Sequence, residues 1–183
     1  MIFENGYLPP PGFFFTVLVA GSGTPLQLSS MADASFQEAS GLEAKIELEL
    51  VKEGGENRYI HQLPGQTTTL NLVLRRGYVT SPSFLSEWAA QTIGANLSAP
   101  ILTQALVVML LGPDHLPRVA WNLYRAWPVR WVTGPFDANR NEVLTEVLEF
   151  TYASITRLPL TDALKMVAPV AGLIQLGKLA KWL

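Results

Sequence analysis

Cysteine is absent from the 183 residues, and histidine occurs only twice, at His61 and His115. Without a thiol the chain cannot form disulfides, thiolate nucleophiles, zinc ribbons or iron–sulfur clusters. Two histidines also argue against a multi-histidine metal site. We therefore expect neither a metal ion nor a cofactor.

Charge is scarce as well, because charged residues make up 15% of the chain against 49% hydrophobic residues, and the net charge is −2. The hydrophobic content argues against a disordered chain, and the absence of a basic surplus argues against nucleic-acid recognition. The charges are unevenly spread, with seven acids and two lysines in residues 33–56 and six arginines and two acids in residues 57–134. This separation fits head-to-tail assembly of copies, or ordinary variation over a surface.

Long hydrophobic runs are also missing. The apolar stretches 13–20 and 166–176 are shorter than the ~20 residues that a transmembrane helix needs. The first residues contain an acid and no basic residue, which is not typical of a signal peptide. We expect neither a membrane-spanning helix nor a secretion signal.

Short β-branched, aromatic or alternating runs, separated by glycine and proline, make up most of the chain. Residues 45–51 alternate charged and aliphatic side chains, which is typical of a half-buried strand. Residues 100–111 are apolar at nearly every position, which is typical of a strand covered on both faces. The expected strands span residues 13–20, 36–41, 45–51, 58–63, 67–75, 100–111, 118–126, 129–133 and 141–152. The pattern predicts a mainly β protein, a β-sandwich or barrel with one packed α-helix.

That helix is expected at residues 82–97, with Ser81 as its N-cap and Pro82 in its first turn. Its buried stripe is expected to hold Leu85, Trp88, Ala89 and Thr92 or Ile93. Residues 160–183 predict a second helical segment, which Pro169 kinks or divides. We therefore expect one domain over residues 1–159 and a C-terminal helical extension over residues 160–183.

Two proline-containing dipeptides are expected to end or interrupt strands. Pro64-Gly65 predicts a turn, and Trp127-Pro128 predicts an interruption between two strands. Trp121, Trp127 and Trp131 lie close together in the sequence. Such a cluster is typical of core and interface packing, and an aromatic platform for sugars or bases is the alternative.

Patterns that carry catalytic chemistry are absent. The glycine-rich segment 21–24 has no lysine close behind it, so it predicts a turn rather than a phosphate loop. Glu142 and Glu146 would share one face of a strand and Glu149 the other. Carboxylates on an exposed strand are usually solvated or paired with arginine, so we expect no acid–base site and no enzyme.

Seven short motifs occur in a characteristic order. They are Phe36-Gln-Glu-Ala-Ser-Gly-Leu42, Glu53-Gly-Gly-Glu-Asn57, Leu63-Pro-Gly65, Leu72-Val-Leu-Arg-Arg-Gly77, Trp88 in the expected helix, Trp121-Asn-Leu-Tyr-Arg-Ala-Trp-Pro128 and Asn141-Glu-Val-Leu-Thr-Glu146. Each is weak alone, but together the series strongly resembles the tail-tube protein family of contractile phage tails and extracellular contractile injection systems. The resemblance covers residues 13–157.

The resemblance implies a subunit whose strands join those of five copies in a hexameric ring that closes as a β-barrel. Rings would stack into a hollow inner tube inside a sheath, on a baseplate, and pass cargo or DNA without sequence-specific binding. The hairpin 45–63 resembles the arm that reaches the neighbouring ring. The contact candidates between rings or subunits are Glu53, Gly54, Gly55, Glu56, Asn57, Pro64, Gly65, Arg75, Arg76, Trp127 and Pro128.

Two departures from the family pattern bear on the role. Arg75 stands where a lysine is expected, and residues 160–183 extend beyond the usual end of the family. The resemblance therefore implies one of three roles: a main tube subunit, a tube-initiating ring at the baseplate or a ring that terminates the tube. We expect assembly in the bacterial cytoplasm, in a phage tail or a released phage tail-like particle.

Two further expectations concern surfaces. The polar faces of residues 45–49 and 141–149 are expected to line the channel. Residues 160–183 carry three lysines and Trp182, so they would dock on a neighbouring subunit or the baseplate. In the alternative, they would act as a membrane-active module at a bilayer interface.

Overall fold

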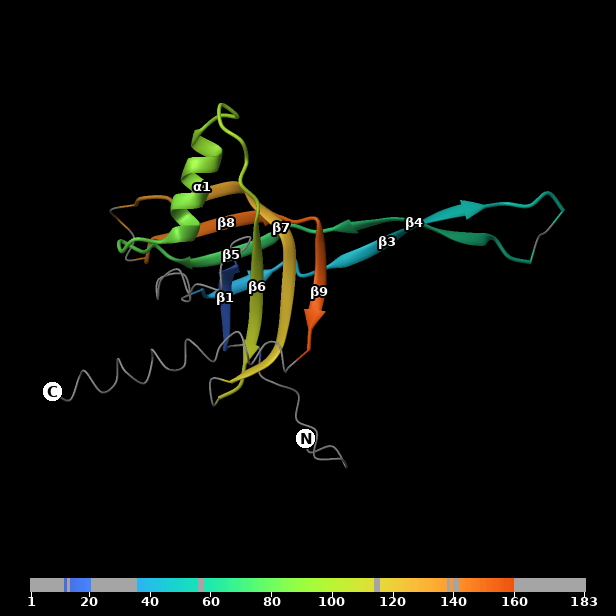
Figure 1. Cartoon of the computed structure of the whole chain (residues 1–183), viewed down its shortest axis with the longest axis horizontal. Helices are drawn as coiled ribbons and strands as arrows, with labels where there is room; N and C mark the ends of the chain where they lie inside the picture. The colour runs from blue at the N-terminus through green and yellow to red at the C-terminus, as the bar shows by residue number, and fades with distance from the viewer. Residues whose placement is uncertain are drawn as a thin grey trace.

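A long shared strand organises the fold of this protein. The computed structural model describes residues 12, 14–20, 36–55, 58–113, 116–137, 139 and 142–159 (Figure 1). Their elements are β1 (Phe15–Ala20), β2 (Glu38–Ser40), β3 (Ala44–Val51), β4 (His61–Thr69), β5 (Leu72–Gly77), α1 (Phe84–Gly94), β6 (Gln104–Leu111), β7 (Pro117–Thr133), β8 (Thr145–Thr151) and β9 (Ser154–Leu158). The mainly β prediction with one packed helix is confirmed within these residues.

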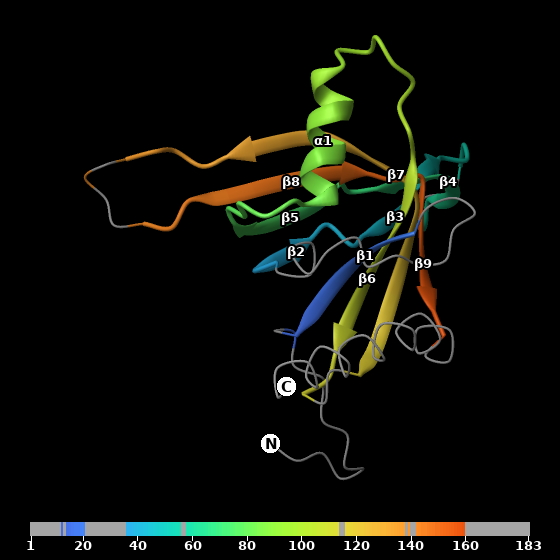
Figure 2. The ribbon, with the colours of Figure 1, turned by 60° about the vertical axis from the view of Figure 1, so that its left-hand side comes forward.

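The seven-stranded sheet has the order β1-β6-β7-β8-β5-β2, and β9 also pairs with β7. The first part of β7 pairs with β6 and β9, and the part from Trp127 onward pairs with β8. Arg125, just before the change of partner, has a positive φ of 53°. The strands on either side of this point run across each other (Figures 1 and 2). The sheet thus folds over itself as a sandwich and is not closed within the subunit.

The predicted interruption at Trp127-Pro128 is wrong, because β7 runs through both residues. Trp127 lies opposite Thr151 and Pro128 lies opposite Phe150 of β8. The register shifts between Pro128 and Arg130. A proline has no N–H to donate to a ladder, and an irregularity at that point lets a strand accommodate it.

The core lies between the two halves of the sheet and under α1. Its buried side chains come from β1, β5, α1, β6, β7 and β8: Val17, Val19, Leu72, Leu74, Leu85, Trp88, Ala89, Leu106, Val108, Leu123, Ala126, Leu148, Phe150 and Tyr152. A second cluster holds Leu18, Val107, Met109 and Ala120. Since β6 contributes to both clusters, its expected burial on both faces is confirmed.

The helix begins two residues later than predicted. Ser83, not Ser81, is the N-cap, and its hydroxyl accepts a hydrogen bond of 3.2 Å from the Ser86 N–H. Leu85, Trp88 and Ala89 are buried as expected, and the Trp88 ring packs 5.4 Å from that of Phe150. The helix therefore covers the inner face of the β5–β8 half of the sheet (Figure 1).

Several strand bounds also differ from the expectations. The strand expected at 67–75 is divided, because β4 ends at Thr69 and β5 begins at Leu72. Leu70, between the two strands, is exposed, whereas Leu72 and Leu74 are buried. Residues 100–103 and 142–144 lie outside β6 and β8. The segments 13, 21–35, 56–57 and 160–183, together with His115, fall outside the described residues, so expectations for them stay predictions. No helix in the part of the chain that the structure describes has the length and apolar character needed to span a membrane.

Candidate assembly surfaces

A two-stranded arm, residues 44–69, projects from the body (Figure 1, right). Within the described residues its strands β3 and β4 pair only with each other. Ile46, Leu48 and Leu50 are 53%, 57% and 59% exposed. The alternation read from the sequence is present, but the half-burial expected for this strand is wrong for the single subunit. A lone two-stranded hairpin is marginally stable in water, so this aliphatic row is suited to covering by a partner.

The predicted turn at Pro64-Gly65 is wrong, because both residues lie inside β4. Pro64 is paired with Leu48 across the ribbon, and the register shifts between Ile46 and Leu48. Paired residues point to the same face, so Pro64 extends the aliphatic row. A Cβ at Gly65 would lie 3.0 Å from the carbonyl oxygen of Glu47, so glycine permits the close approach of the two strands there.

The tip of the arm carries three of the candidate contact residues. Glu53, Gly54 and Gly55 are exposed, and Gly55 has a φ of +92° that favours glycine. The Glu53 carboxylate lies 3.3 Å from His61 Nε2. The other two tip candidates, residues 56 and 57, fall outside the described residues.

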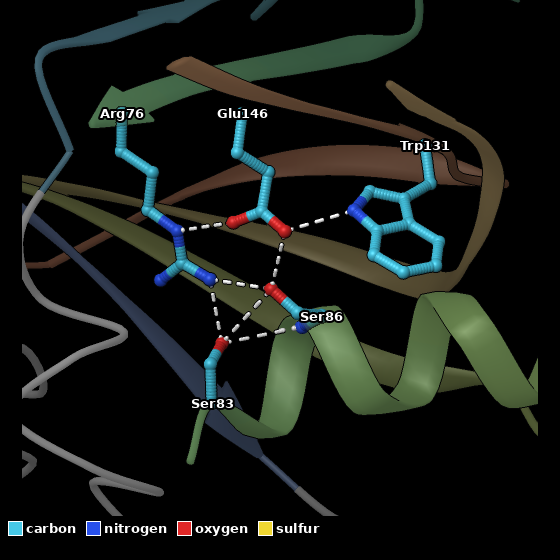
Figure 3. Close-up of polar contacts among 5 residues, drawn as sticks. All are labelled: Arg76, Ser83, Ser86, Trp131 and Glu146. Carbon is cyan, nitrogen blue, oxygen red and sulfur yellow. Dashed lines mark hydrogen bonds and ion pairs between the residues drawn. The ribbon is translucent and has the colours of Figure 1, made fainter. Parts of the chain in front are cut away.

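Arg76 lies in the interior, in a polar network that joins the sheet to the start of α1 (Figure 3). Its Nε donates to Glu146 Oε2 at 2.8 Å. Its terminal nitrogen donates to the hydroxyls of Ser83 and Ser86, both at 2.6 Å. The other oxygen of Glu146 accepts hydrogen bonds of 2.8 Å from Ser86 and from the Trp131 indole. Both charges of this ion pair are thus buried and extensively hydrogen-bonded.

This network corrects two expectations. Arg76 is completely buried, so it holds the subunit together internally rather than presenting its charge to a neighbouring subunit. Glu146 is paired with an arginine, as one of the two expected alternatives had it, but it is buried and so is not available to line a channel. Of the remaining candidates, Trp127 is half-buried against the core and Pro128 is buried, which leaves them little surface for contacts between subunits.

The opposite face of the same strands carries charged side chains, of which Arg75 and Arg130 are exposed and Glu149 is half-buried. Arg75 lies 3.9 Å from Glu38, and Arg130 lies 3.7 Å from Glu149. Glu149 also accepts a hydrogen bond of 2.8 Å from the Asn71 amide. Alternation therefore separates the neighbouring arginines of β5, with Arg76 inside and Arg75 outside.

A second projection, the connection between β7 and β8, lies on the other side of the body from the arm (Figures 1 and 2). Phe136 and Val143 are 84% and 80% exposed there. Large apolar side chains gathered on a projecting connection are typical of an interaction site. Val143 belongs to the Asn141–Glu146 motif, whereas Phe136, beside Gly134-Pro135, belongs to none of the seven motifs.

Tyr152 and possible metal ligands are the remaining chemical groups of interest in the described part of the chain. Three or more histidine, aspartate or glutamate side chains do not come together there as metal ligands. Burial, and to a smaller degree the charge of Glu43, raise the pKa of the Tyr152 phenol above its usual 10.0, although a hydrogen bond from the Glu43 backbone opposes this. Tyr152 lies at the base of the arm, and the sequence motifs did not include it.

The chain is similar to one protein family and to several solved structures. The model of a family described as "T4-like virus tail tube protein gp19" matches residues 11–156. A chain in the cryo-EM structure of the anti-feeding prophage baseplate, 6-fold symmetrised, is 32% identical; the match covers 84% of this chain and 98% of that chain, with a TM-score of 0.73. The search of curated proteins gave no match.

Two more distant structures share the fold. A chain of the anti-feeding prophage tube-terminating cap is 22% identical, over 83% of this chain and 92% of that one, with a TM-score of 0.67. A chain of the PVC sheath–tube complex of an extracellular contractile injection system, in the extended state, is 20% identical, over 82% and 91%, with a TM-score of 0.66.

Proposed function

Because the chain belongs to the T4-like virus tail tube protein gp19 family, we propose that it is a structural subunit of the inner tube of a contractile injection system or phage tail. Six copies form a ring around a central channel, and rings stack into the tube. The family is one of structural tube proteins, and the subunit works mechanically, without enzymatic activity. The 6-fold symmetrised baseplate structure that holds the 32% identical chain supports the ring.

The projecting arm is the single observation that carries this proposal. Three large aliphatic side chains on β3 remain more than half exposed, on a ribbon that has no further strand partner in the described residues. Exposed apolar surface and open strand edges promote association between chains. In a ring, neighbouring copies cover the arm and complete the sheet. The exposed apolar row and the open strand edges of the single subunit are therefore the surfaces through which copies associate.

The contact residues follow from this placement. We assign the contacts between copies to the arm, through Pro64 and Gly65 and the tip residues 53–57, and to Arg75 on the outer face of β5. The face of β7 and β8 that carries Arg130 and Glu149 is assigned to the channel. This oppositely charged pair suits passage of cargo or DNA without sequence-specific binding.

Partners and location complete the proposal. The subunit stacks on itself and contacts sheath and baseplate proteins, and the particle is assembled in the bacterial cytoplasm before it acts as a phage tail or an extracellular injection system. Residues 160–183 dock on a neighbouring subunit or the baseplate.

Electron microscopy of the purified chain tests the proposal. Wild-type protein is expected to form rings of six copies that stack into hollow tubes at high concentration. A Leu48→Ser/Leu50→Ser variant is expected to remain as folded single subunits, while a Gln91→Ser variant on the exposed face of α1 is the matched control and assembles. A wild-type protein that stays monomeric even when concentrated refutes the tube role.

A ring at one end of the tube is the second candidate. The 32% identical chain comes from a baseplate structure, whereas the chain from the tube-terminating cap is 22% identical. This difference favours the tube-initiating ring over the terminating ring. Single rings that do not stack, and that form tubes only when a separate tube protein is added, would establish this role.

A further inference from the structure

The arm and the body are two parts of one long hairpin that is interrupted at the base of the arm. β2 pairs with β5 in the body, and β3 pairs with β4 in the arm. Between these ladders, residues 41–43 on one side and 70–71 on the other belong to no strand. The arm is consequently a separate two-stranded sheet, and no continuous ladder sets its direction relative to the body.

Tyr152 occupies this interruption. It directly follows β8, and its ring is part of the main core. Its hydroxyl lies 2.8 Å from the carbonyl oxygen of Gly41 and 3.1 Å from that of Glu43. The same hydroxyl oxygen accepts a 3.4 Å hydrogen bond from the Glu43 N–H. Because a phenol has a single hydrogen to donate, the two carbonyls share it, and the segment leading into β3 wraps around the phenol.

The returning strand is tied to the same residue. The Thr69 hydroxyl, at the end of β4, donates to the carbonyl oxygen of Tyr152 at 3.1 Å. Two residues further on, the Asn71 amide donates to Glu149 of β8 at 2.8 Å. Gly41 has a φ of +85°, and a Cβ there would lie 1.9 Å from the Asn71 carbonyl oxygen, so the two strands touch at this point. Both strands of the arm are therefore fastened to the end of β8 through Tyr152.

From this geometry we infer that Tyr152 is a positioning residue, which holds the arm in one direction for docking on the next copy. The inference rests on the proposed tube function. An arm that is already held in its bound direction loses less conformational freedom when it binds than one that swings. Six arms in a ring must take the same direction, so loss of the Tyr152 hydroxyl affects assembly more than it affects the fold.

The test measures the direction of the arm in the soluble subunit. The cysteine-free chain permits two spin labels, at Glu49→Cys on the arm and Gln91→Cys on α1, with distances measured by electron paramagnetic resonance below the concentration at which assembly begins. The Tyr152→Phe variant keeps the ring in the core and removes only the hydroxyl. Thr69→Val removes the second tie without touching the core, and Tyr124→Phe, an exposed tyrosine on β7, is the matched control.

Tyr152→Phe is expected to broaden the distance distribution between the labels. It is also expected to raise the concentration needed for assembly about five- to tenfold, because the arm must then be ordered on binding, at a cost similar to the net contribution of one hydrogen bond. Thr69→Val is expected to broaden the distribution as well, and Tyr124→Phe to leave both quantities unchanged. A distribution as narrow in both variants as in the wild type overturns the positioning role, even if Tyr152→Phe lowers stability. Failure of the wild type to assemble would refute the tube function and leave the distance measurement intact as a test of Tyr152.

Discussion

Removing the charge of Glu146 is expected to destabilise the subunit severely. The Glu146→Gln substitution preserves the shape of the side chain and an amide oxygen that can still accept from Ser86 and Trp131. It removes the carboxylate charge that lies 2.8 Å from the Arg76 guanidinium, which has no exposed surface. The amide nitrogen of the new glutamine would also face the Arg76 Nε donor, which now lies 2.8 Å from a carboxylate oxygen.

The magnitude follows from burial. Breaking a fully buried ion pair by removing one partner costs about 3–5 kcal/mol, because an uncompensated charge stays in the interior. For a domain of this size, each kcal/mol lowers the melting temperature by roughly 2–4 °C, so a fall of about 6–20 °C is expected. Urea denaturation, followed by tryptophan fluorescence and by circular dichroism, measures the free energy directly.

A neighbouring pair on the same strands supplies the control. Arg75 and Glu38 lie 3.9 Å apart with more than half of each side chain exposed, so Glu38→Gln is expected to cost at most about 1 kcal/mol. Replacing both buried partners, as Arg76→Met/Glu146→Leu, is expected to be less harmful than Glu146→Gln alone, because no charge is left unpaired. If Glu146→Gln cost no more than Glu38→Gln, the view of this network as the anchor of α1 would be wrong.

Three further results are expected. Leu48→Ser/Leu50→Ser should change the unfolding free energy of the single subunit by less than about 1 kcal/mol, since both side chains are exposed, but should weaken assembly more than tenfold, because each leucine buried at an interface contributes over ~1 kcal/mol. Urea titration measures the first quantity and sedimentation velocity the second, and a large loss of subunit stability would contradict the prediction. Gly41→Ala should lower the free energy of unfolding more than Gly55→Ala does. Both positions have positive φ, but only at Gly41 would the new Cβ meet a backbone atom, the Asn71 oxygen at 1.9 Å. Equal losses of unfolding free energy in urea denaturation would disprove the close contact. The pKa of the Tyr152 phenol is raised above 10.0, so the folded state holds the phenol proton more tightly than the unfolded state does, and the resulting stabilisation is complete below pH 10 and lost as the pH rises further. The unfolding free energy measured from pH 8 to 11 should therefore fall more steeply in the wild type than in Tyr152→Phe. Parallel plots of unfolding free energy against pH for the two proteins would count against the buried phenol.

The periodicity of hydrophobic residues predicted more of the fold than the positions of glycine and proline did. Leu85, Trp88 and Ala89 of the expected helical stripe are buried, as is the middle of β6 on both faces, whereas Ile93 is exposed. Arg76 was nevertheless expected on the surface, although it shares the face of Leu72 and Leu74, and Glu146 shares that of Leu148 and Phe150. Reading both strands by the same alternation would have placed the two charges opposite each other in the interior, where each requires the other.

Proline was the main source of error in the predicted elements. Pro64 and Pro128 both lie inside strands, and in each case the register shifts close by. A shift of register depends on the partner strand, which comes from a distant part of the sequence, so no local pattern reveals it. The same reason hides the base of the arm, because Tyr152 meets Gly41 and Glu43 across more than a hundred residues.

Burial in the arm could not be predicted from alternation alone. The pattern of β3 is that of a strand with one covered face, yet in the single subunit that face has no cover. Alternation reports which face is selected to be apolar, whereas the partner that covers it can lie in another molecule. An alternating strand that is exposed on both faces is thus a quantitative sign of assembly. In this chain the sign coincides with a ribbon whose base is hydrogen-bonded to Tyr152, the residue that we propose sets the direction in which the arm docks.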